Sequence, residues 1–306
     1  MTAAPVPDWI AADWGTTNLR VWAMDGAGRV LARADSEDGM GRLDRAGYEP
    51  ALLRLVAPWL PARGSVAVVA CGMVGSRQGW VEAPYRAVPC PPFGPGPLAR
   101  PQCRDPRLRV HVIPGLRQDA PADVMRGEET QIAGFLARNP GFDGVLCLPG
   151  THSKWVLVSA GEVVAFQTFM TGEIFALLTR QSVLRHSTEG AGWDGAAFAG
   201  AVSEGLSHPE RVAASLFTLR AEGLLHGLAP DRARARLSGL LVGAELAGAR
   251  AYWLGQRVAV IGSARLAGIY AEALGLQGLE AETADVEAMT LAGLTAAHAR
   301  LAEAIA

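Results

Sequence analysis

One order of segments occurs twice in this chain: a short apolar strand, a polar turn, two further strands and then a helix. The first copy covers residues 9–60 and opens with WIAAD, and the second covers residues 144–184 and opens with GVLCLPG. Apolar runs joined by tight polar turns predict antiparallel strands. A repeated unit of this size predicts two similar α/β domains in tandem, each opening with a turn large enough to hold a phosphate group.

The remaining segments extend both domains. Strands are predicted over 65–72 and 110–115, and helices over 127–138 and 211–250; residues 256–275 read as a strand, a glycine turn and a helix. The proline density of 84–106 predicts a rigid surface loop, because proline cannot continue a helix or a central strand. We divide the chain into an N-terminal domain, 1–140, and a C-terminal domain, 141–306. The last amphipathic stretch, 284–304, is lined by Ala, Leu and Met and is expected to dock back on the N-terminal domain.

Composition narrows the function classes. The 306 residues suffice for two domains with sizeable cores, and 50% hydrophobic with 19% charged residues is typical of a globular protein. The net charge of -2 comes from dispersed residues, which indicates neither nucleic acid nor an anionic membrane as a partner. The start, MTAAPVPDW, has no basic region or apolar core, so we expect no signal peptide and no membrane span.

The cysteines argue against a zinc or redox site. Cys71, Cys90, Cys103 and Cys147 lie far apart without a C-x-x-C pair, and the six histidines do not cluster at ligand spacing. Free thiols in a reducing compartment are the simplest interpretation, so we expect a cytoplasmic protein.

The turn of the first copy, Asp13-Trp14-Gly15-Thr16-Thr17-Asn18, carries the groups that a nucleoside triphosphate needs. The Asp13 carboxylate suits magnesium or its waters, and Gly15 lets the backbone approach a phosphate. The hydroxyls of Thr16 and Thr17 are donors for phosphate oxygens. A plain structural turn remains the alternative.

Two further turns are of the same kind. Gly150-Thr151-His152-Ser153-Lys154 offers a flexible backbone, two hydroxyls and the only lysine among 28 basic residues, although a polar loop explains it equally well. Lys154 either neutralises phosphate charge or points to solvent. Gly262-Ser263 ends a buried strand and opens a helix, where free N–H groups attract anions, but such junctions are common in α/β proteins.

In this order the three turns resemble the phosphate-1, phosphate-2 and adenosine motifs of the actin-like ATPase superfamily. More specifically, the chain resembles the 2-dehydro-3-deoxygalactonokinase family. The segments that carry the resemblance are DWGTTNLR (13–20), CGMVGSRQGWVEAPY (71–85), DVMRGEETQ (123–131), LPGTHSKWV (148–156), TFMTGE (168–173) and IGSARLAGIY (261–270). They span most of the chain, and the resemblance is weakest over 187–250.

This resemblance implies two tandem actin-like, ribonuclease H-like α/β domains with an ATP cleft between them. It implies magnesium-dependent transfer of a phosphoryl group from ATP to the C6 hydroxyl of 2-dehydro-3-deoxy-D-galactonate in galactonate catabolism. The partners would be the sugar acid and ATP, and a homodimer is compatible with the fold. Three alternatives stay open: a kinase for another sugar or sugar acid such as 2-keto-3-deoxygluconate, an exopolyphosphatase-like phosphohydrolase, and a non-catalytic regulator.

The resemblance also suggests roles for individual residues. Related kinases place an aspartate after a glycine at a helix start, and Glu128 holds that place here, so it is the expected base. Asp123 and Glu129 are its rivals, and Asp13 is expected to bind magnesium. For the sugar acid, the candidates come from three loops: Asn18, Arg77, Gln78, Thr171 and Glu173. An arginine fork suits a carboxylate.

Overall fold

The computed structural model describes residues 6–94 and 96–303. Its strands form two five-stranded sheets and one three-stranded sheet. The first sheet has the order β3-β2-β1-β4-β6. Its strands are β1 (Trp9–Trp14), β2 (Leu19–Met24), β3 (Val30–Ser36), β4 (Val66–Gly72) and β6 (Leu108–Val112). The first three strands pair antiparallel, whereas β4 runs parallel to β1 and β6 parallel to β4.

The second five-stranded sheet has the order β11-β10-β9-β12-β13. Its strands are β9 (Gly144–Leu148), β10 (Ser153–Ser159), β11 (Glu162–Phe169), β12 (Val258–Gly262) and β13 (Glu282–Asp285). As in the first sheet, the opening hairpin is antiparallel and the last two strands are parallel to its first strand. The two sheets therefore share one topology, which confirms the predicted tandem α/β architecture of actin-like, ribonuclease H-like type.

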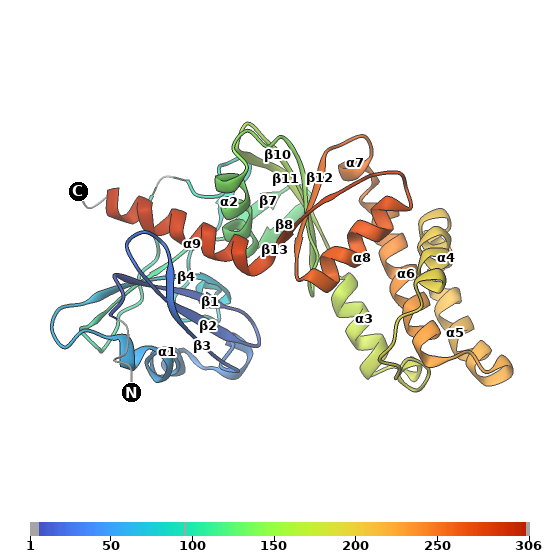
Figure 1. Ribbon diagram of the computed structural model, residues 1–306, viewed down its shortest axis with the longest axis horizontal. Helices are drawn as coiled ribbons and strands as arrows, with labels where there is room; N and C mark the ends of the chain where they lie inside the picture. The colour runs from blue at the N-terminus through green and yellow to red at the C-terminus, as the bar shows by residue number, and fades with distance from the viewer. Residues whose placement is uncertain (1–5, 95, 304–306) are drawn as a thin grey trace. The chain divides into compact units, whose positions relative to one another are not determined.

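Helices cover both sheets (Figure 1). The helices of the described residues are α1 (Tyr48–Val56), α2 (Glu128–Arg138), α3 (Thr171–Arg180), α4 (Gly195–Ser207), α5 (Val212–His226), α6 (Pro230–Gly248), α7 (Arg250–Trp253), α8 (Ala264–Gly275) and α9 (Val286–Glu303). Among them, α5 packs on α6 and not on a sheet. Over the residues that the structure describes, no helix combines the length and the apolarity that crossing a membrane requires.

The chain folds as two compact units. The first contains the residues through Phe142, the short segment Ser159–Val164 and the residues from Val286 onward, and the second contains Asp143–Val158 and Ala165–Asp285. The last helix, α9, contacts α2, β1 and β4 within the first unit. Its contact with α2 is so close that a Cβ on Gly134 would lie 1.9 Å from the Met289 carbonyl oxygen.

Alternation along β1 decides which face each side chain takes, because successive residues of a strand point to opposite sides. Ile10 and Trp14 pack in the cluster that contains α1, whereas Trp9 and Ala11 pack with α9 residues. Asp13 has the parity of Trp9 and Ala11. It therefore lies on the face of the sheet that α2 and α9 cover.

Two local features differ from the predictions. The helix that closes the first copy of the repeat ends at Val56, before residue 60, and continues as a 3-10 turn, Ala57–Trp59, because Pro58 cannot continue the α-helical hydrogen bonds. The segments Leu116–Asp119 (β7) and Ala122–Met125 (β8) form an unpredicted hairpin, which joins β5 (Arg86–Ala87) in a three-stranded sheet. The LRQD and ADVM sequences lack the apolar alternation that marks a strand.

Candidate active site

Asp13 lies at the carboxyl end of β1 and faces polar groups from both neighbouring strands. Its partners in the sheet register are Arg20 on β2 and Cys71 on β4. Asp13 Oδ2 lies 3.6 Å from Arg20 Nη1, and the Cys71 thiol donates to Asp13 Oδ1 at 3.8 Å. Burial raises the pKa of Asp13, with the charge of Arg20 opposing that shift and the carboxylates of Glu287 and Glu128 adding to it. Asp13 is thus the centre of an acidic group at this end of the first sheet.

The turn after Asp13 is fixed by the segment 39–41. The N–H groups of Gly39, Met40 and Gly41 donate to the carbonyls of Thr17, Gly15 and Thr16 at 3.1, 3.0 and 2.9 Å. A Cβ on Gly39 would lie 2.2 Å from the Thr17 carbonyl carbon, so this approach requires glycine. Because the turn carbonyls bond to this segment, the exposed side chains of Thr16, Thr17 and Asn18 are left on the solvent side.

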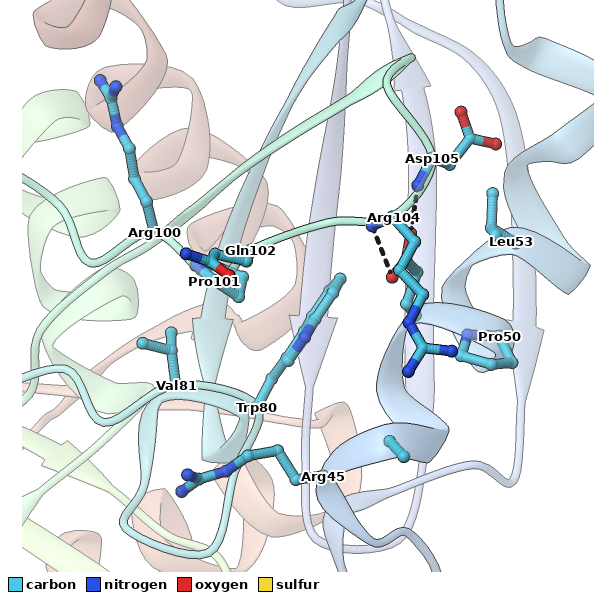
Figure 2. A pocket seen from close by; sticks show the side chains of 12 residues that line it. Arg45, Pro50, Leu53, Trp80, Val81, Arg100, Pro101, Gln102, Arg104 and Asp105 are labelled. Atoms are coloured by element: carbon cyan, nitrogen blue, oxygen red, sulfur yellow. Dashed lines mark hydrogen bonds between the residues drawn. The ribbon is translucent and has the colours of Figure 1, made fainter.

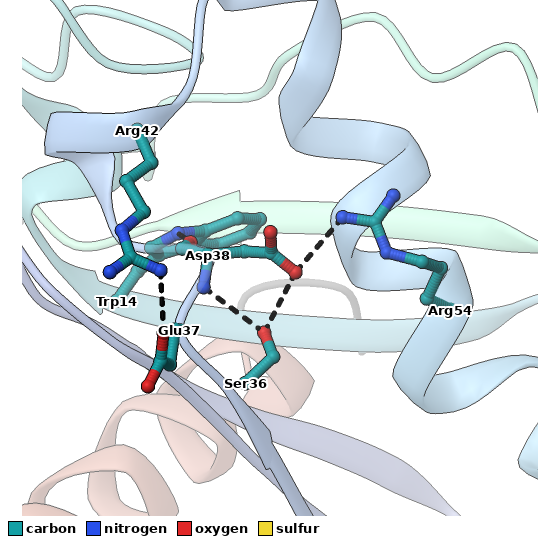
Figure 3. Close-up of polar contacts among 6 residues, drawn as sticks. All are labelled: Trp14, Ser36, Glu37, Asp38, Arg42 and Arg54. Atoms are coloured by element: carbon teal, nitrogen blue, oxygen red, sulfur yellow. Dashed lines mark hydrogen bonds and ion pairs between the residues drawn. The ribbon is translucent and has the colours of Figure 1, made fainter.

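Side chains hold the segment before Gly39 in place, as Figure 3 shows. The Trp14 indole N–H donates to the Asp38 carbonyl at 2.8 Å. The Asp38 carboxylate in turn accepts from Ser36 Oγ and from Arg54 Nη2, both at 2.9 Å. The segment that bonds to the first turn is therefore itself held by hydrogen bonds from Trp14, Ser36 and Arg54.

Helix α2 begins next to the end of β4. Gly72 and Gly127 both have positive φ, at 89° and 108°, and a Cβ on Gly127 would lie 3.4 Å from the Gly72 Cα. This close glycine contact brings the first residue of α2, Glu128, to the carboxyl end of the sheet. Glu128 Oε2 accepts from the Arg126 N–H at 3.1 Å.

Glu129 is completely buried behind this helix start. Its carboxylate accepts from the Gly127 N–H at 2.7 Å and from the Thr130 hydroxyl at 3.1 Å. Burial, with a smaller contribution from the Glu128 charge, raises the pKa of Glu129 to about 7. Glu129 therefore fixes the backbone that presents Glu128.

The acidic group of the first unit fits a magnesium ion that arrives with a nucleotide. Among the described residues, no cluster of three or more His, Cys, Asp or Glu side chains is arranged to hold a metal. Magnesium in nucleotide sites is typically held by one or two carboxylates together with phosphate oxygens and waters. Asp13, whose side chain is 26% exposed, can supply such a carboxylate.

The second predicted turn lies at the carboxyl end of β9 and is supported by the start of α3. The Glu173 N–H donates to the Thr151 carbonyl at 2.9 Å, and a Cβ on Gly172 would lie 2.1 Å from the Gly150 carbonyl oxygen. His152 Nε2 and Glu173 Oε2 are 2.5 Å apart. Glu173, a predicted sugar contact, is thus a partner of the second turn.

The third predicted element adjoins this turn. Gly262 ends β12, which runs parallel to β9, and a Cβ on it would lie 3.3 Å from Pro149 Cγ. Ser263 is the N-cap of α8, and its hydroxyl accepts from the Leu266 N–H at 3.5 Å. The start of α8 and the second turn therefore meet at one edge of the second sheet.

Of the two positions considered for Lys154 from the sequence, the structure excludes the one in which the side chain points to solvent. Lys154 belongs to β10, pairs with Leu148 and is only 4% exposed, so its side chain does not extend into solvent. Its ammonium group donates to the His152 carbonyl at 3.4 Å. Lys154 therefore places a positive charge beneath the second turn.

A cavity of about 280 Å³ opens beside the second turn, within the second unit. Gly150, Thr171, Gly172 and Tyr270 line it together with residues of α3, α6 and α8 and with Trp193 of the segment before α4: Phe175, Trp193, Arg234, Ser238, Leu241, Val242, Arg265, Leu266 and Ile269. The Arg234 guanidinium lies 5.0 Å from the centre of the Phe175 ring. An aromatic, basic cavity of this kind suits a planar group attached to an anion.

The remaining predicted residues lie elsewhere in the first unit. Arg77 and Gln78 are exposed after the 3-10 turn Met73–Gly75, and Arg45 donates to the Arg77 carbonyl at 3.1 Å. Asp123 is on β8, opposite Gln118, and its carboxylate accepts from the N–H of Val124 at 2.7 Å. Asp123 thus belongs to the three-stranded sheet, whereas Glu128 begins α2.

A cavity of about 900 Å³ in the first unit is not lined by the predicted site residues. Its walls include Trp80 and Glu49, whose carboxylate accepts from the N–H groups of Arg104 and Asp105. In Figure 2, the guanidinium groups of Arg45, Arg100 and Arg104 point in different directions. The side chains of this cavity therefore do not converge on one ligand group.

Sequence reasoning missed two carboxylates of these regions. Glu287, in the first turn of α9, acts electrostatically on Asp13 across more than 270 residues of chain. Glu245 is buried in α6 and hydrogen-bonded to residues around the second turn. A sequence signal existed for Glu245 alone, because it is the single acid in the apolar run LSGLLVGAELAG.

Comparison with known proteins gives concordant findings. A family model described as 2-keto-3-deoxy-galactonokinase matches residues 13–297. A probable 2-dehydro-3-deoxygalactonokinase of Rhizobium meliloti (strain 1021) is 40% identical over 303 residues, covering 94% of this chain and 96% of that protein. A 2-dehydro-3-deoxygalactonokinase of Escherichia coli (strain K12) is 35% identical over 300 residues, covering 95% and 98%. A crystal structure of a candidate 2-dehydro-3-deoxygalactonokinase from Sinorhizobium meliloti has a TM-score of 0.85 and 38% identity, with 96% of each chain covered.

Proposed function

We propose, because the chain belongs to the 2-keto-3-deoxy-galactonokinase family, that it is an ATP-dependent kinase for 2-dehydro-3-deoxy-D-galactonate. The family match from residue 13 to residue 297 carries this proposal, since the matched range includes Asp13, Glu128 and the Gly150 turn. The resemblance found in the sequence is thereby confirmed. The proposed product is the 6-phosphate of the sugar acid.

The chemistry assigned to the first unit is activation of the acceptor hydroxyl. Its oxygen attacks the γ-phosphorus of ATP, the bond from that phosphorus to the β–γ bridging oxygen breaks, and ADP leaves. The hydroxyl proton passes to the Glu128 carboxylate, which must be ionised to accept it. Asp13 would hold magnesium, which would supply neutralisation of the phosphate charge, and the hydroxyls of Thr16 and Thr17 would donate to phosphate oxygens.

The second unit is the proposed nucleotide side. Gly150, Thr151 and His152 form a turn whose backbone and hydroxyl groups suit phosphate oxygens, with the buried charge of Lys154 beneath it. The 280 Å³ cavity beside this turn suits the nucleoside, with Trp193 and Phe175 as apolar surfaces for the base. Gly262 and Ser263 add the N-terminus of α8, which favours an anion.

The first unit is the proposed sugar-acid side. Arg77 and Gln78 are exposed on one turn and offer a guanidinium fork and an amide for the substrate carboxylate and hydroxyls. Asn18 is exposed on the neighbouring Asp13 turn. Thr171 and Glu173, by contrast, belong to the support of the second turn. A cytoplasmic location, favoured by four free cysteines, and a homodimer stay predictions.

The proposal is tested by measuring ADP release together with formation of the sugar-acid phosphate. The panel contains 2-dehydro-3-deoxygalactonate, its gluconate epimer, a simple hexose and polyphosphate. We expect turnover that requires ATP and magnesium, with the largest kcat/KM for the galactonate-derived acid. A larger kcat/KM for the gluconate epimer or the hexose would overturn the substrate, and hydrolysis of polyphosphate without any acceptor would overturn the kinase activity itself.

A further inference from the structure

A buried carboxylate lies behind the second turn without a role in the proposed chemistry. Glu245, on α6, is 2% exposed. Its Oε1 accepts from the Trp155 indole N–H and its Oε2 from the Tyr270 hydroxyl, both at 2.8 Å. The side chains of Thr171 and Ser153 also hydrogen-bond to it. All of these partners are neutral, so hydrogen bonds alone compensate for the burial of this acid.

The partners of Glu245 come from three elements next to the second turn, namely β10, α3 and α8. Ser153 and Trp155 start β10, directly after Gly150, Thr151 and His152. Thr171 starts α3, whose next two residues touch the Gly150 and Thr151 backbone. Tyr270, on α8, also lies within 3.0 Å of Ser153 Oγ and lines the 280 Å³ cavity. One carboxylate thus connects the strand that follows the turn to the start of α3 and to α8.

Packing alone does not require an acid at this position. The network adjoins an apolar cluster that includes Trp155, Val242, Leu246 and Tyr270. A buried charge without an opposite charge is costly, and well-packed apolar residues often give equal or greater stability. What a carboxylate adds is direction, because each of its oxygens fixes the donors that point at it.

We propose that Glu245 is a positioning residue for ATP, which holds the Gly150–His152 turn and the start of α3 in the geometry that receives the phosphates. This inference rests on the proposed function, in that it takes the second turn to be a phosphate site. Glu245 is remote from the reacting atoms and acts through Ser153 and Thr171. Its loss should therefore weaken ATP binding and leave the sugar-acid site of the first unit unchanged.

The test uses the full-length chain and two conservative variants. Glu245→Gln keeps the shape and removes the charge, and Tyr270→Phe removes one donor and leaves the carboxylate. For both we expect the Kd of MgATP, measured by calorimetry without sugar acid, to rise about tenfold, and KM for ATP to rise in parallel. The KM for the sugar acid should stay within about twofold of the wild-type value.

Trp253→Phe is the matched control for a merely structural effect. Trp253 is buried in the same apolar cluster, and its indole N–H donates to the Leu246 carbonyl at 2.8 Å. The Trp253→Phe variant therefore loses packing and one buried hydrogen bond in the same unit, which matches the loss of one buried hydroxyl in Tyr270→Phe. This variant should lower the melting temperature and leave the Kd of MgATP unchanged. An equal loss of ATP affinity in Trp253→Phe would overturn the positioning role.

Thr151→Ala separates this inference from the proposed function. If Thr151→Ala weakens MgATP binding and both network variants bind normally, the positioning role of Glu245 is wrong while the phosphate turn stands. If none of the three variants changes ATP binding in an active kinase, the phosphate role of the second turn is wrong, and the inference fails with it.

Discussion

The two turns proposed to bind phosphate occupy equivalent places in equivalent sheets, yet they are held by different interactions. Each follows the first strand of its sheet, and each is approached by a glycine from a neighbouring segment, Gly39 in the first unit and Gly172 in the second. The first turn receives three backbone hydrogen bonds from residues 39–41. The second receives one backbone bond from Glu173, and side-chain contacts of His152, Ser153 and Lys154 add to it. A shared topology therefore fixes where a turn lies but not what holds it.

The buried acids of the two units differ in the same way. Glu129 accepts hydrogen bonds from its own helix start and lies close to a second carboxylate, Glu128. Glu245 instead collects donors from separate segments of the second unit. Glu129 bonds only to residues next to it in the chain, whereas Glu245 bonds to residues of β10, α3 and α8. The comparison predicts that the first unit controls the chemical step and that the second controls ATP binding.

The largest expected effect comes from Glu128→Gln. Removing a general base typically costs 10²- to 10⁴-fold in rate, so kcat should fall about 1,000-fold. The Kd of MgATP should not change, because the proposed role of Glu128 is to accept the proton of the sugar-acid hydroxyl and not to bind magnesium or phosphate. Single-turnover kinetics and calorimetry measure the two quantities on the same preparation.

Asp123→Asn is the matched control for this prediction. Asp123 has an acidic side chain only five residues before Glu128, but it lies on β8 and bonds to the Val124 N–H. The variant should retain kcat within a few-fold. If Asp123→Asn is inactive and Glu128→Gln is active, the base is Asp123, and the catalytic role assigned to the start of α2 is wrong.

The positions of most strands and of the three turns could be predicted from the sequence because they depend on neighbouring residues. The alternation of WIAAD and LRVWAMD, with Asp13 to Asn18 between them, already contains the first hairpin. The same holds for Gly150 and Thr151 after GVLCL, and for Gly262 and Ser263 before α8. In each case the chemistry-bearing residues follow directly from the strand that positions them.

The supports of these turns could not be predicted in the same way. Glu245 and Tyr270 lie near the second turn only because α6 and α8 pack on the sheet. No pattern of neighbouring residues in the sequence predicts this tertiary contact. Glu129 looks like any first-turn acid, and its complete burial follows from the α2–α9 contact. The hairpin of β7 and β8 was missed for a related reason, since its residues are polar.

The second prediction concerns the glycines that approach the turns. An added Cβ would lie 2.2 Å from the Thr17 backbone at Gly39 and 2.1 Å from the Gly150 backbone at Gly172, so either turn must move. Displacements of about 1 Å in a reacting group cost up to about 100-fold. Gly39→Ala and Gly172→Ala should each lower kcat/KM for ATP by one to two orders of magnitude in a coupled assay.

Gly200→Ala is the control, because a Cβ at that position of α4 meets nothing within 4 Å and alanine favours a helix. It should leave kcat/KM for ATP unchanged. An effect of Gly172→Ala without one of Gly39→Ala would mean that the first turn is not a phosphate site. The reverse result would remove the phosphate role of the second turn.

The smallest expected effect is a change in how stability depends on pH. The pKa of Glu129 is raised from 4.5 to about 7 in the folded protein, so between these values the folded state binds more protons than the unfolded state. Wild-type stability should therefore contain a contribution that is lost as the pH rises from about 4.5 to about 7, amounting to about 3 kcal/mol. Glu129→Gln lacks that titration, so its urea-unfolding free energy relative to wild type should increase by this amount between pH 5 and pH 8. Glu82→Gln removes an exposed carboxylate of the same unit and should follow the wild-type curve. If the difference in unfolding free energy between Glu129→Gln and wild type stays constant with pH, Glu129 is ionised throughout this range. Burial would then not raise the pKa of Glu129 as expected.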